Sequence, residues 1–340
     1  MHKYPKVNYI GNKEKLVQWI ISEMPVKKGK VLDIFAGGCS VSYALKDAGY
    51  EVIANDILYA DYIIAMALIS NDTVAISDDV FETKINSRQV SSIRNKISFL
   101  DDRLYYPEEV DELARLITIS EKLDDSQKYL FLALVRRAMI RKLPYSRMNV
   151  PWNQIQQLRD EEYSYRKYKR KRAYHNQTFE SHMRENMNEY NSAIFQGKSC
   201  EVYNVDVMRL AENISRVDVV YMDPPYPSTM NNYDAFYGLF DDMFSKRATH
   251  MDFTNKSTFL NNLEELIKAL KNKTKYIVLS QNTRVQPGRE EIMEMLSKYG
   301  KVELKAKKHN YQVTGKDNKN SSKELLFILK LWNKILCVKR

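Results

Sequence analysis

The sequence has few of the residues that build disulfide frameworks or zinc sites. Its 340 residues include three cysteines, Cys39, Cys200 and Cys337, which are too few and too scattered for a disulfide framework. Scattered thiols are typical of a reducing compartment, so we expect a cytoplasmic protein. None of the five histidines pairs with a cysteine at the spacing of zinc ligands, so we expect no metal.

Long apolar runs are also absent. No stretch approaches the ~18 apolar residues of a membrane-spanning helix, and the polar amino terminus has no signal-peptide hydrophobic region. With 44% hydrophobic and 28% charged residues, the chain is typical of a globular protein with one large domain or two ordinary ones. We therefore expect no membrane partner.

Glycine is scarce, at ten residues, and the full G-x-G-x-x-G spacing of a dinucleotide-binding loop does not occur. One glycine turn, Gly37-Gly38, follows a predicted strand, but Cys39 stands where a further small residue would complete the pattern. Asp56 follows the next predicted strand, where an acid can bind ribose hydroxyls. The turn and the acid together favour a nucleoside cofactor without phosphates.

Acidic residues are outnumbered by basic ones, which gives a formal net charge of +10 and a pI near 9.2. Residues 163–174 (YSYRKYKRKRAY) interleave basic and aromatic side chains without an acid, and a second basic group lies within residues 136–147. Such interleaving suits phosphate contact and base stacking. A solvated helix face is the alternative, but the missing counter-charge favours a nucleic-acid partner.

Strand and helix patterns predict a sheet built from both ends of the chain. We expect the first part to alternate helices and strands, at residues 13–24, 30–35, 41–48, 51–55 and 58–69. We expect the last part to hold strands at residues 200–205, 217–222, 276–280, 302–305 and 325–332, with helices at 259–271 and 290–299. This rhythm is typical of a doubly wound α/β sheet, and the final two strands suggest an antiparallel hairpin at its edge.

The middle of the chain lacks this rhythm. Helical patterns dominate residues 80–196, with helices at 107–123 and 126–141, followed by an irregular, aromatic and basic stretch at 143–174. We therefore predict three parts, at residues 1–79, 80–196 and 197–340.

The most informative segment is residues 219–226, VVYMDPPY. Its apolar run predicts a buried strand, and its two prolines predict a stiff loop, because proline fixes φ and restrains the residue before it. Open α/β sheets bind ligands at such carboxyl ends of strands. The carboxylate of Asp223, an outward carbonyl oxygen and the ring of Tyr226 would bind a planar amine. A proline-rich turn without function is the alternative, which the flanking acid and aromatic residue disfavour.

These motifs, in this order, resemble the amino-methylating DNA methyltransferases of the Dam-like adenine class, which use S-adenosylmethionine. The similarity covers roughly residues 4–70 and 195–330. Asp223, Pro224, Pro225 and Tyr226 match the catalytic motif of that family. Four further segments resemble its cofactor loop, amino-terminal motif, ribose-binding acid and carboxyl-terminal strand: residues 33–38 (DIFAGG), 9–13 (YIGNK), 55–56 (ND) and 322–329 (SKELLFIL).

The resemblance implies a class I methyltransferase fold, a doubly wound mixed sheet with a mostly helical target-recognition insert. It implies cofactor contacts from Tyr9, Lys13, Asp33, Phe35, Gly37, Gly38, Asp56, Tyr203, Asp206 and Asp223. In this set Lys13 would lie near the methionine end of the cofactor and Asp56 would hold the ribose hydroxyls. Tyr203 and Asp206 would border the adenine of the cofactor, although purely structural roles for these two stay open.

The resemblance also implies the reaction, methylation of the exocyclic N6 of adenine in duplex DNA. Asp223 and the carbonyl of Pro224 would accept the two N–H bonds of the amine, and Tyr226 would stack on the base. Two acceptors would pull the nitrogen toward sp³ geometry and free its lone pair for attack on the sulfonium methyl. The base must be flipped out of the duplex to reach such a site. Three alternatives stay open: an RNA adenine, a DNA cytosine, or a silent binding protein of the same fold.

The helical insert is the expected reader of the DNA sequence. Its candidate DNA contacts are basic, aromatic or amide side chains: Arg141, Lys142, Tyr145, Arg147, Asn149, Arg166, Lys169, Arg170 and Arg172. The expected partners are double-stranded DNA and a cognate restriction endonuclease. The expected location is the cytoplasm of a prokaryotic or phage-infected cell.

Overall fold

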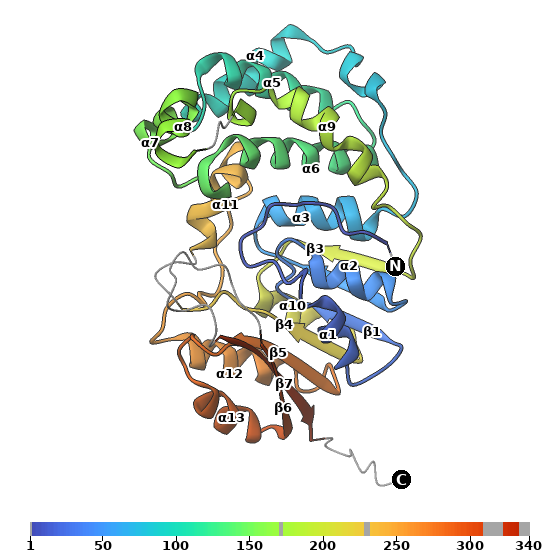
Figure 1. Cartoon of the computed structure of the whole chain (residues 1–340). Helices are drawn as coiled ribbons and strands as arrows, with labels where there is room; N and C mark the ends of the chain where they lie inside the picture. Colours follow the sequence, from blue (N-terminus) through green and yellow to red (C-terminus); the bar gives the residue numbers. More distant parts are fainter. Residues whose placement is uncertain (1, 170–172, 228–231, 309–321, 333–340) are drawn as a thin grey trace.

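The computed structural model describes residues 2–169, 173–227, 232–308 and 322–332 (Figure 1). Arg170 and Arg172, two of the candidate DNA contacts, lie outside this part. No helix within it is long and apolar enough to cross a membrane, and it contains no cluster of His, Cys, Asp and Glu that fits a metal ion.

A seven-stranded sheet forms the centre of the molecule, in the order β3-β2-β1-β4-β5-β7-β6. Neighbouring strands from β3 to β5 run parallel, whereas β7 is antiparallel to both β5 and β6. The strands are β1 (Lys30–Asp33), β2 (Glu51–Asn55), β3 (Cys200–Tyr203), β4 (Val219–Met222), β5 (Tyr276–Asn282), β6 (Gly300–Lys308) and β7 (Lys323–Leu331). The predicted doubly wound mixed sheet is confirmed. The predicted hairpin forms at the edge, with β7 inserted between β5 and β6.

Helices cover both faces of the sheet (Figure 1). One face carries α1 (Val17–Ser22), α2 (Ser40–Asp47) and α3 (Tyr59–Ala65), which continues as a π-helical turn at Met66–Ser70. The other carries α10 (Val207–Asn213), α12 (Phe259–Leu270) and α13 (Arg289–Ser297). Side chains alternate across the buried strand β4, where Val219 and Tyr221 join the first core and Val220 and Met222 the second.

Helices from the middle of the chain form a layer above α3 (Figure 1). They are α4 (Ser87–Ile97), α5 (Pro107–Ser120), α6 (Asp125–Lys142), α7 (Trp152–Arg159), α8 (Glu161–Tyr168) and α9 (Phe179–Asn191). Helix α6 is buried along most of its length because it packs against α3 on one side and α5 and α9 on the other. The insert therefore shares one hydrophobic core with the first face of the sheet.

Part of the insert is more regular than its sequence indicates. Residues 143–174, predicted as irregular, contain α7 and α8. Asp160 begins α8, because its side chain accepts a hydrogen bond from the backbone N–H of Tyr163, a common N-cap contact. The prediction was wrong because local capping outweighs the crowded aromatic and basic composition. Helices α10 and α11 (Tyr233–Met243) were likewise not predicted from the sequence.

Candidate functional site

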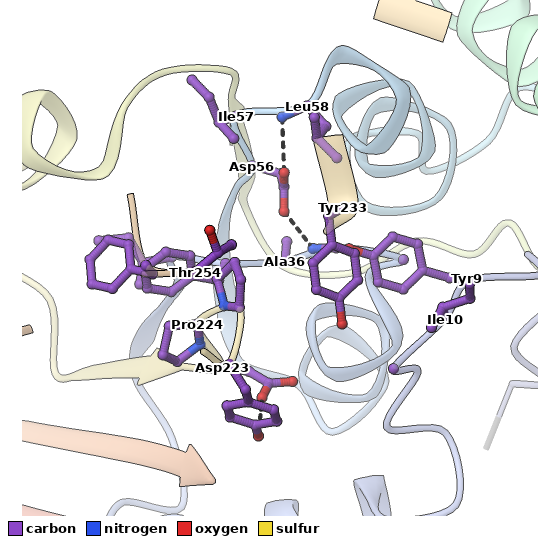
Figure 2. Close-up of a pocket in the computed structure, with 18 of the residues that line it drawn as sticks. Tyr9, Ile10, Ala36, Asp56, Ile57, Leu58, Asp223, Pro224, Tyr233 and Thr254 are labelled. Atoms are coloured by element: carbon purple, nitrogen blue, oxygen red, sulfur yellow. Dashed lines mark hydrogen bonds between the residues drawn. The ribbon is translucent and has the colours of Figure 1, made fainter. Parts of the chain in front are cut away.

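A cavity of about 1020 Å³ lies where β1, β2 and β4 end (Figure 2). Among its lining residues are most of those expected from the sequence: Tyr9, Lys13, Asp33, Phe35, Gly37, Gly38, Asp56, Asp206, Asp223, Pro224, Pro225 and Tyr226. They come from segments far apart in the chain. The parallel strands bring these residues together, because the carboxyl ends of the strands meet at one edge of the sheet.

The glycine turn after β1 forms one wall of the cavity together with Tyr9. Gly37 has a φ of +49°, and a Cβ there would lie 2.8 Å from Cε1 of Tyr9. A Cβ on Gly38 would lie 2.9 Å from Cβ of the same tyrosine. Tyr9 is held in turn by stacking on Tyr233 and Tyr237, with ring centroids 5.6 and 5.2 Å away. Both glycines are thus required by the close approach of Tyr9.

Asp56 closes the opposite end of this wall. Its carboxylate accepts backbone hydrogen bonds from Gly37, at 2.8 Å, and from Leu58, at 3.0 Å (Figure 2). The pKa of Asp56 is raised, because burial outweighs the lowering effect of these two hydrogen bonds. Each carboxylate oxygen has a second lone pair, so the same side chain is able to accept hydroxyl groups from the cavity.

Asp33 lies at the end of β1 and lines the cavity. Its Oδ2 accepts a hydrogen bond from the Ser42 hydroxyl at 2.6 Å, whereas its buried Oδ1 has no hydrogen-bond partner among the described residues. Burial raises the pKa of Asp33 to about 7. A buried acceptor without a partner beside a cavity fits a ligand that brings its own polar hydrogen.

These acceptors and the glycine turn therefore fit a nucleoside cofactor. Asp56 suits hydroxyl groups, Oδ1 of Asp33 suits an N–H or ammonium group, and the glycine turn permits close approach to the backbone. On the apolar side, Phe35 packs edge-to-face on buried Phe253, with ring centroids 5.1 Å apart. The cofactor contacts expected of Asp33, Phe35, Gly37, Gly38 and Asp56 stay predictions, for which this geometry is suited.

Asp223 follows β4 and belongs to a cluster of charged and hydroxyl groups. Its Oδ1 lies 3.0 Å from Nζ of Lys13 and accepts a hydrogen bond from the Tyr226 hydroxyl at 2.8 Å. The same ammonium lies 3.1 Å from Oε1 of Glu324 on β7. Lys13 and Glu324 are 3% and 0% exposed, whereas the Asp223 side chain is 18% exposed and lines the cavity. The pKa of Asp223 is raised, mainly by burial and further by the Glu324 charge. The Lys13 ammonium opposes this shift.

The structure gives Tyr226 and Lys13 contacts that the sequence did not suggest. Tyr226 is 8% exposed, and its hydroxyl points to Asp223 rather than to solvent. Its ring still lines the cavity, so stacking on a base stays a prediction. Lys13 directly contacts the carboxylate of Asp223, and its expected place near the methionine end of the cofactor stays a prediction.

Two predicted cofactor contacts have structural roles. Tyr203 on β3 is not among the residues that line the cavity, and its hydroxyl donates to Glu201 at 2.8 Å. Asp206 lines the cavity, but its Oδ1 caps α10 and its Oδ2 accepts the backbone N–H of Met251 at 2.8 Å. The structure thus contradicts the expectation for Tyr203, whose hydroxyl bonds to Glu201 on the same strand, outside the cavity lining. It gives Asp206 a clear capping function.

The candidate DNA contacts divide into exposed and buried residues. Tyr145 is 50% exposed, Asn149 is exposed, and Arg147 lines the cavity beside them. Arg166 and Lys169 are exposed at the end of α8. Lys142, however, is 1% exposed and pairs with Glu109 at 2.7 Å, so the structure contradicts its prediction as a DNA contact. Arg141 is half-buried and donates to His182 at 3.2 Å.

Sequence reasoning missed two contributors to the site. Glu324 was recognised only as part of a strand, although an acid directly before the apolar run LLFIL is itself a signal of a buried charge. Tyr233 was not named, because no local pattern marks a residue at the start of α11 that packs on Tyr9.

The sheet, the glycine turn and the acids at the strand ends define an α/β enzyme with a nucleoside-type cofactor site. Residues 9–295 match the family of D12 class N6 adenine-specific DNA methyltransferases, and the chain belongs to this family. The match agrees with the resemblance seen in the sequence motifs. The fold and the family together imply a methyl donor of the S-adenosylmethionine type.

Curated relatives agree with the family assignment. The chain is 46% identical to the type II methyltransferase M2.HphI of Haemophilus parahaemolyticus, over 96% of this chain and 98% of that protein. It is 23% identical to the type II methyltransferase M.CviAII of Paramecium bursaria Chlorella virus 1, over 89% and 92% of the two chains. A third relative, M.NlaIII of Neisseria lactamica, is also 23% identical, over 88% and 90%.

Proposed function

We propose that the protein transfers a methyl group from S-adenosylmethionine to N6 of an adenine flipped out of duplex DNA. The observation that carries the proposal is the position of Asp223, a partly exposed carboxylate at the cavity wall that is fixed by Lys13 and Tyr226. The bound cofactor would supply the electrophilic methyl group. The protein would supply the acceptors that orient the amine.

In this proposal the cofactor is held by residues in and around the glycine turn after β1. Asp56 accepts the ribose hydroxyls, Oδ1 of Asp33 accepts a polar hydrogen of the cofactor, and Phe35 packs on its apolar surface. Gly37 and Gly38 leave the backbone accessible.

The amine is held by the loop after β4. Asp223 accepts one N–H of the adenine amine, and the carbonyl of Pro224 accepts the other. Both acceptors draw the nitrogen out of conjugation with the ring, so its lone pair becomes available. Pro225 keeps the loop stiff, and the ring of Tyr226 stacks on the base, which returns roughly 1–3 kcal/mol of the energy of flipping.

We propose that residues 80–196 read the DNA, with the loop after α6 facing the flipped base. Arg147 supports this placement, because it lines the cavity and its guanidinium lies 5.6 Å from the ring centre of exposed Tyr145. Arg166 and Lys169 would contact phosphates from the end of α8. The enzyme would act in the cytoplasm beside a cognate restriction endonuclease, in line with its type II methyltransferase relatives.

Digestion of duplex DNA after incubation with labelled S-adenosylmethionine tests the reaction. We expect label in N6-methyladenine from the wild type and from Asp79→Ala, an exposed control just before the insert, and at least a hundredfold less from Asp223→Ala. Label in methylcytosine, or in RNA but not in DNA, would replace the proposed substrate. Equal labelling by Asp223→Ala would remove Asp223 from the reaction.

A further inference from the structure

Glu324 is a buried carboxylate that the proposed reaction does not yet use. It is 0% exposed on β7, and its Oε1 accepts hydrogen bonds from the Ser280 hydroxyl at 2.6 Å and the Tyr226 hydroxyl at 3.4 Å. Lys13 lies 3.1 Å from the same oxygen. Burying a carboxylate costs free energy unless hydrogen-bond donors compensate it. Strand β7 places the Glu324 carboxylate beside these three donors.

Two of these donors are shared with Asp223. Nζ of Lys13 lies 3.0 Å from Asp223 and 3.1 Å from Glu324, and the Tyr226 hydroxyl lies 2.8 and 3.4 Å from the same two carboxylates. The ammonium thus bridges two acids, whereas the single hydroxyl hydrogen of Tyr226 is shared between them and lies closer to Asp223. Without Glu324, the ammonium of Lys13 would lose one of the two carboxylates that it contacts.

This sharing determines how strongly Asp223 binds a further hydrogen. A carboxylate that is fully engaged by an ammonium ion is a weaker acceptor for the substrate, because the same lone pairs and charge are already used. Glu324 forms a second ion pair with Lys13 and so holds the ammonium between the two acids. The Asp223 carboxylate then remains a strong hydrogen-bond acceptor for a group in the cavity.

We propose that Glu324 is a positioning residue for methyl transfer: it holds Lys13 and Tyr226 so that Asp223 is fixed in place yet remains a strong acceptor for the target amine. This inference rests on the proposed function only in naming the amine. The effect on Asp223 itself is a property of the free protein.

Several titratable groups surround Asp223 and enter the interpretation of any pH profile. Lys13 and Tyr226 contact it directly, while Asp33 from β1, Tyr221 from β4, Tyr233 from α11 and Glu324 from β7 interact with it electrostatically. Glu324 raises the pKa of Asp223, whereas Lys13 lowers it. Removing the Glu324 charge therefore lowers the pKa of Asp223.

The test is Glu324→Gln, which keeps the size of the side chain but removes its charge. Carbon-13 NMR of aspartate-labelled protein, assigned with Asp223→Asn, reports the Asp223 carboxyl directly. We expect its midpoint to fall by about one pH unit. In single-turnover methylation, the acid limb should move in the same direction, and the rate constant above it should fall roughly tenfold, the effect of one lost hydrogen bond to a charged group.

The matched control is Glu303→Gln on β6, an acid with a 61% exposed side chain that pairs with Lys305, and it should leave both profiles unchanged. Glu324→Asp keeps the charge but moves it away from Lys13, so its titration should fall between those of the wild type and Glu324→Gln. It carries the same test if Glu324→Gln does not fold.

An Asp223 titration identical to wild type in the folded variant would overturn the proposal. So would a slower rate without any displacement of the pH profile, which is what a merely structural role predicts. If the wild type transfers no methyl group from S-adenosylmethionine, the proposed function fails, but the NMR titration still decides the role of Glu324.

Discussion

The hydroxyl of Tyr226 donates a hydrogen bond of 2.8 Å to Oδ1 of Asp223, three residues earlier in the same loop. Tyr226 therefore makes two contributions: its ring lies at the cavity wall, and its hydroxyl fixes the carboxylate that we propose to be catalytic. The two prolines between them keep the loop stiff, so this contact needs no further ordering when a substrate arrives.

Substitution of Tyr226 separates these contributions. Tyr226→Phe keeps the ring but removes the hydroxyl, so we expect the single-turnover rate constant to fall roughly tenfold, with unchanged DNA affinity. Tyr226→Ala also removes the ring, and its loss should be at least tenfold greater. Rapid-quench methylation and fluorescence anisotropy measure the two quantities. Equal rates for the two variants would show that the ring contributes nothing.

Substitution of Asp56 tests the proposed cofactor site. Asp56→Ala should weaken S-adenosylmethionine binding by about a hundredfold, because a charged acceptor is lost and Gly37 is released from its 2.8 Å hydrogen bond. Asp56→Asn keeps one oxygen acceptor and should lose less. Calorimetry measures the affinity, and DNA binding should survive in both variants. Wild-type affinity in Asp56→Ala would remove this residue from the cofactor site.

Asp33 should make stability depend on pH. Its folded pKa is about 7, above the ordinary value of 3.8, so the folded state binds the proton more tightly between these limits. The contribution of Asp33 to stability is therefore fully present below pH 3.8 and is lost as the pH rises through about 7, at up to about 1.4 kcal/mol per pH unit.

Asp33→Asn removes this dependence. Denaturant unfolding of both proteins between pH 5 and 8 should give a stability difference that grows in favour of the variant as the pH rises. Asp241, whose pKa burial also raises to about 7, is present in both proteins and cancels in the difference. Two curves that stay parallel over this range would contradict the raised pKa of Asp33.

The basic residues of the insert should separate into two classes. Arg166→Ala and Lys169→Ala change exposed side chains and should each lower the slope of log affinity for DNA against log salt by about 1, without loss of stability. Lys142→Ala breaks a buried pair with Glu109 and should cost roughly 3 kcal/mol of stability with an unchanged slope. Salt titrations by anisotropy and denaturant unfolding measure these effects. A reduced salt slope in Lys142→Ala would restore it as a DNA contact.

Much of the sheet was predictable because strand signals are local. The predicted strand at residues 51–55 coincides with β2, and the other strands begin and end within a few residues of their predicted positions. The turn at Gly37-Gly38 and the loop at Asp223 were also predictable, because glycine and proline restrict backbone geometry wherever they occur. Helices α7 and α8 were not, because aromatic and basic residues obscure their periodicity.

The burial of charged residues was not predictable, because it depends on partners far away in the chain. Arg136 and Lys142 look like members of a basic patch, but α6 lies between α3 and the outer helices. They pair there with Asp61, at 3.3 Å, and Glu109, at 2.7 Å. Tyr203 looked like a cofactor contact until β3 directed its hydroxyl to Glu201.

The sequence by itself determined the parts of this methyltransferase that are local in the chain: the order of its motifs, the glycine turn and the proline-stiffened loop that carries Asp223. The tertiary structure decided how that carboxylate is held. Lys13, Asp223 and Glu324 meet only because β4 and β7 both flank β5 and the amino-terminal segment crosses the strand ends. Charges interact over a few ångströms in space and not along the chain, so folding alone sets which oxygen Lys13 binds.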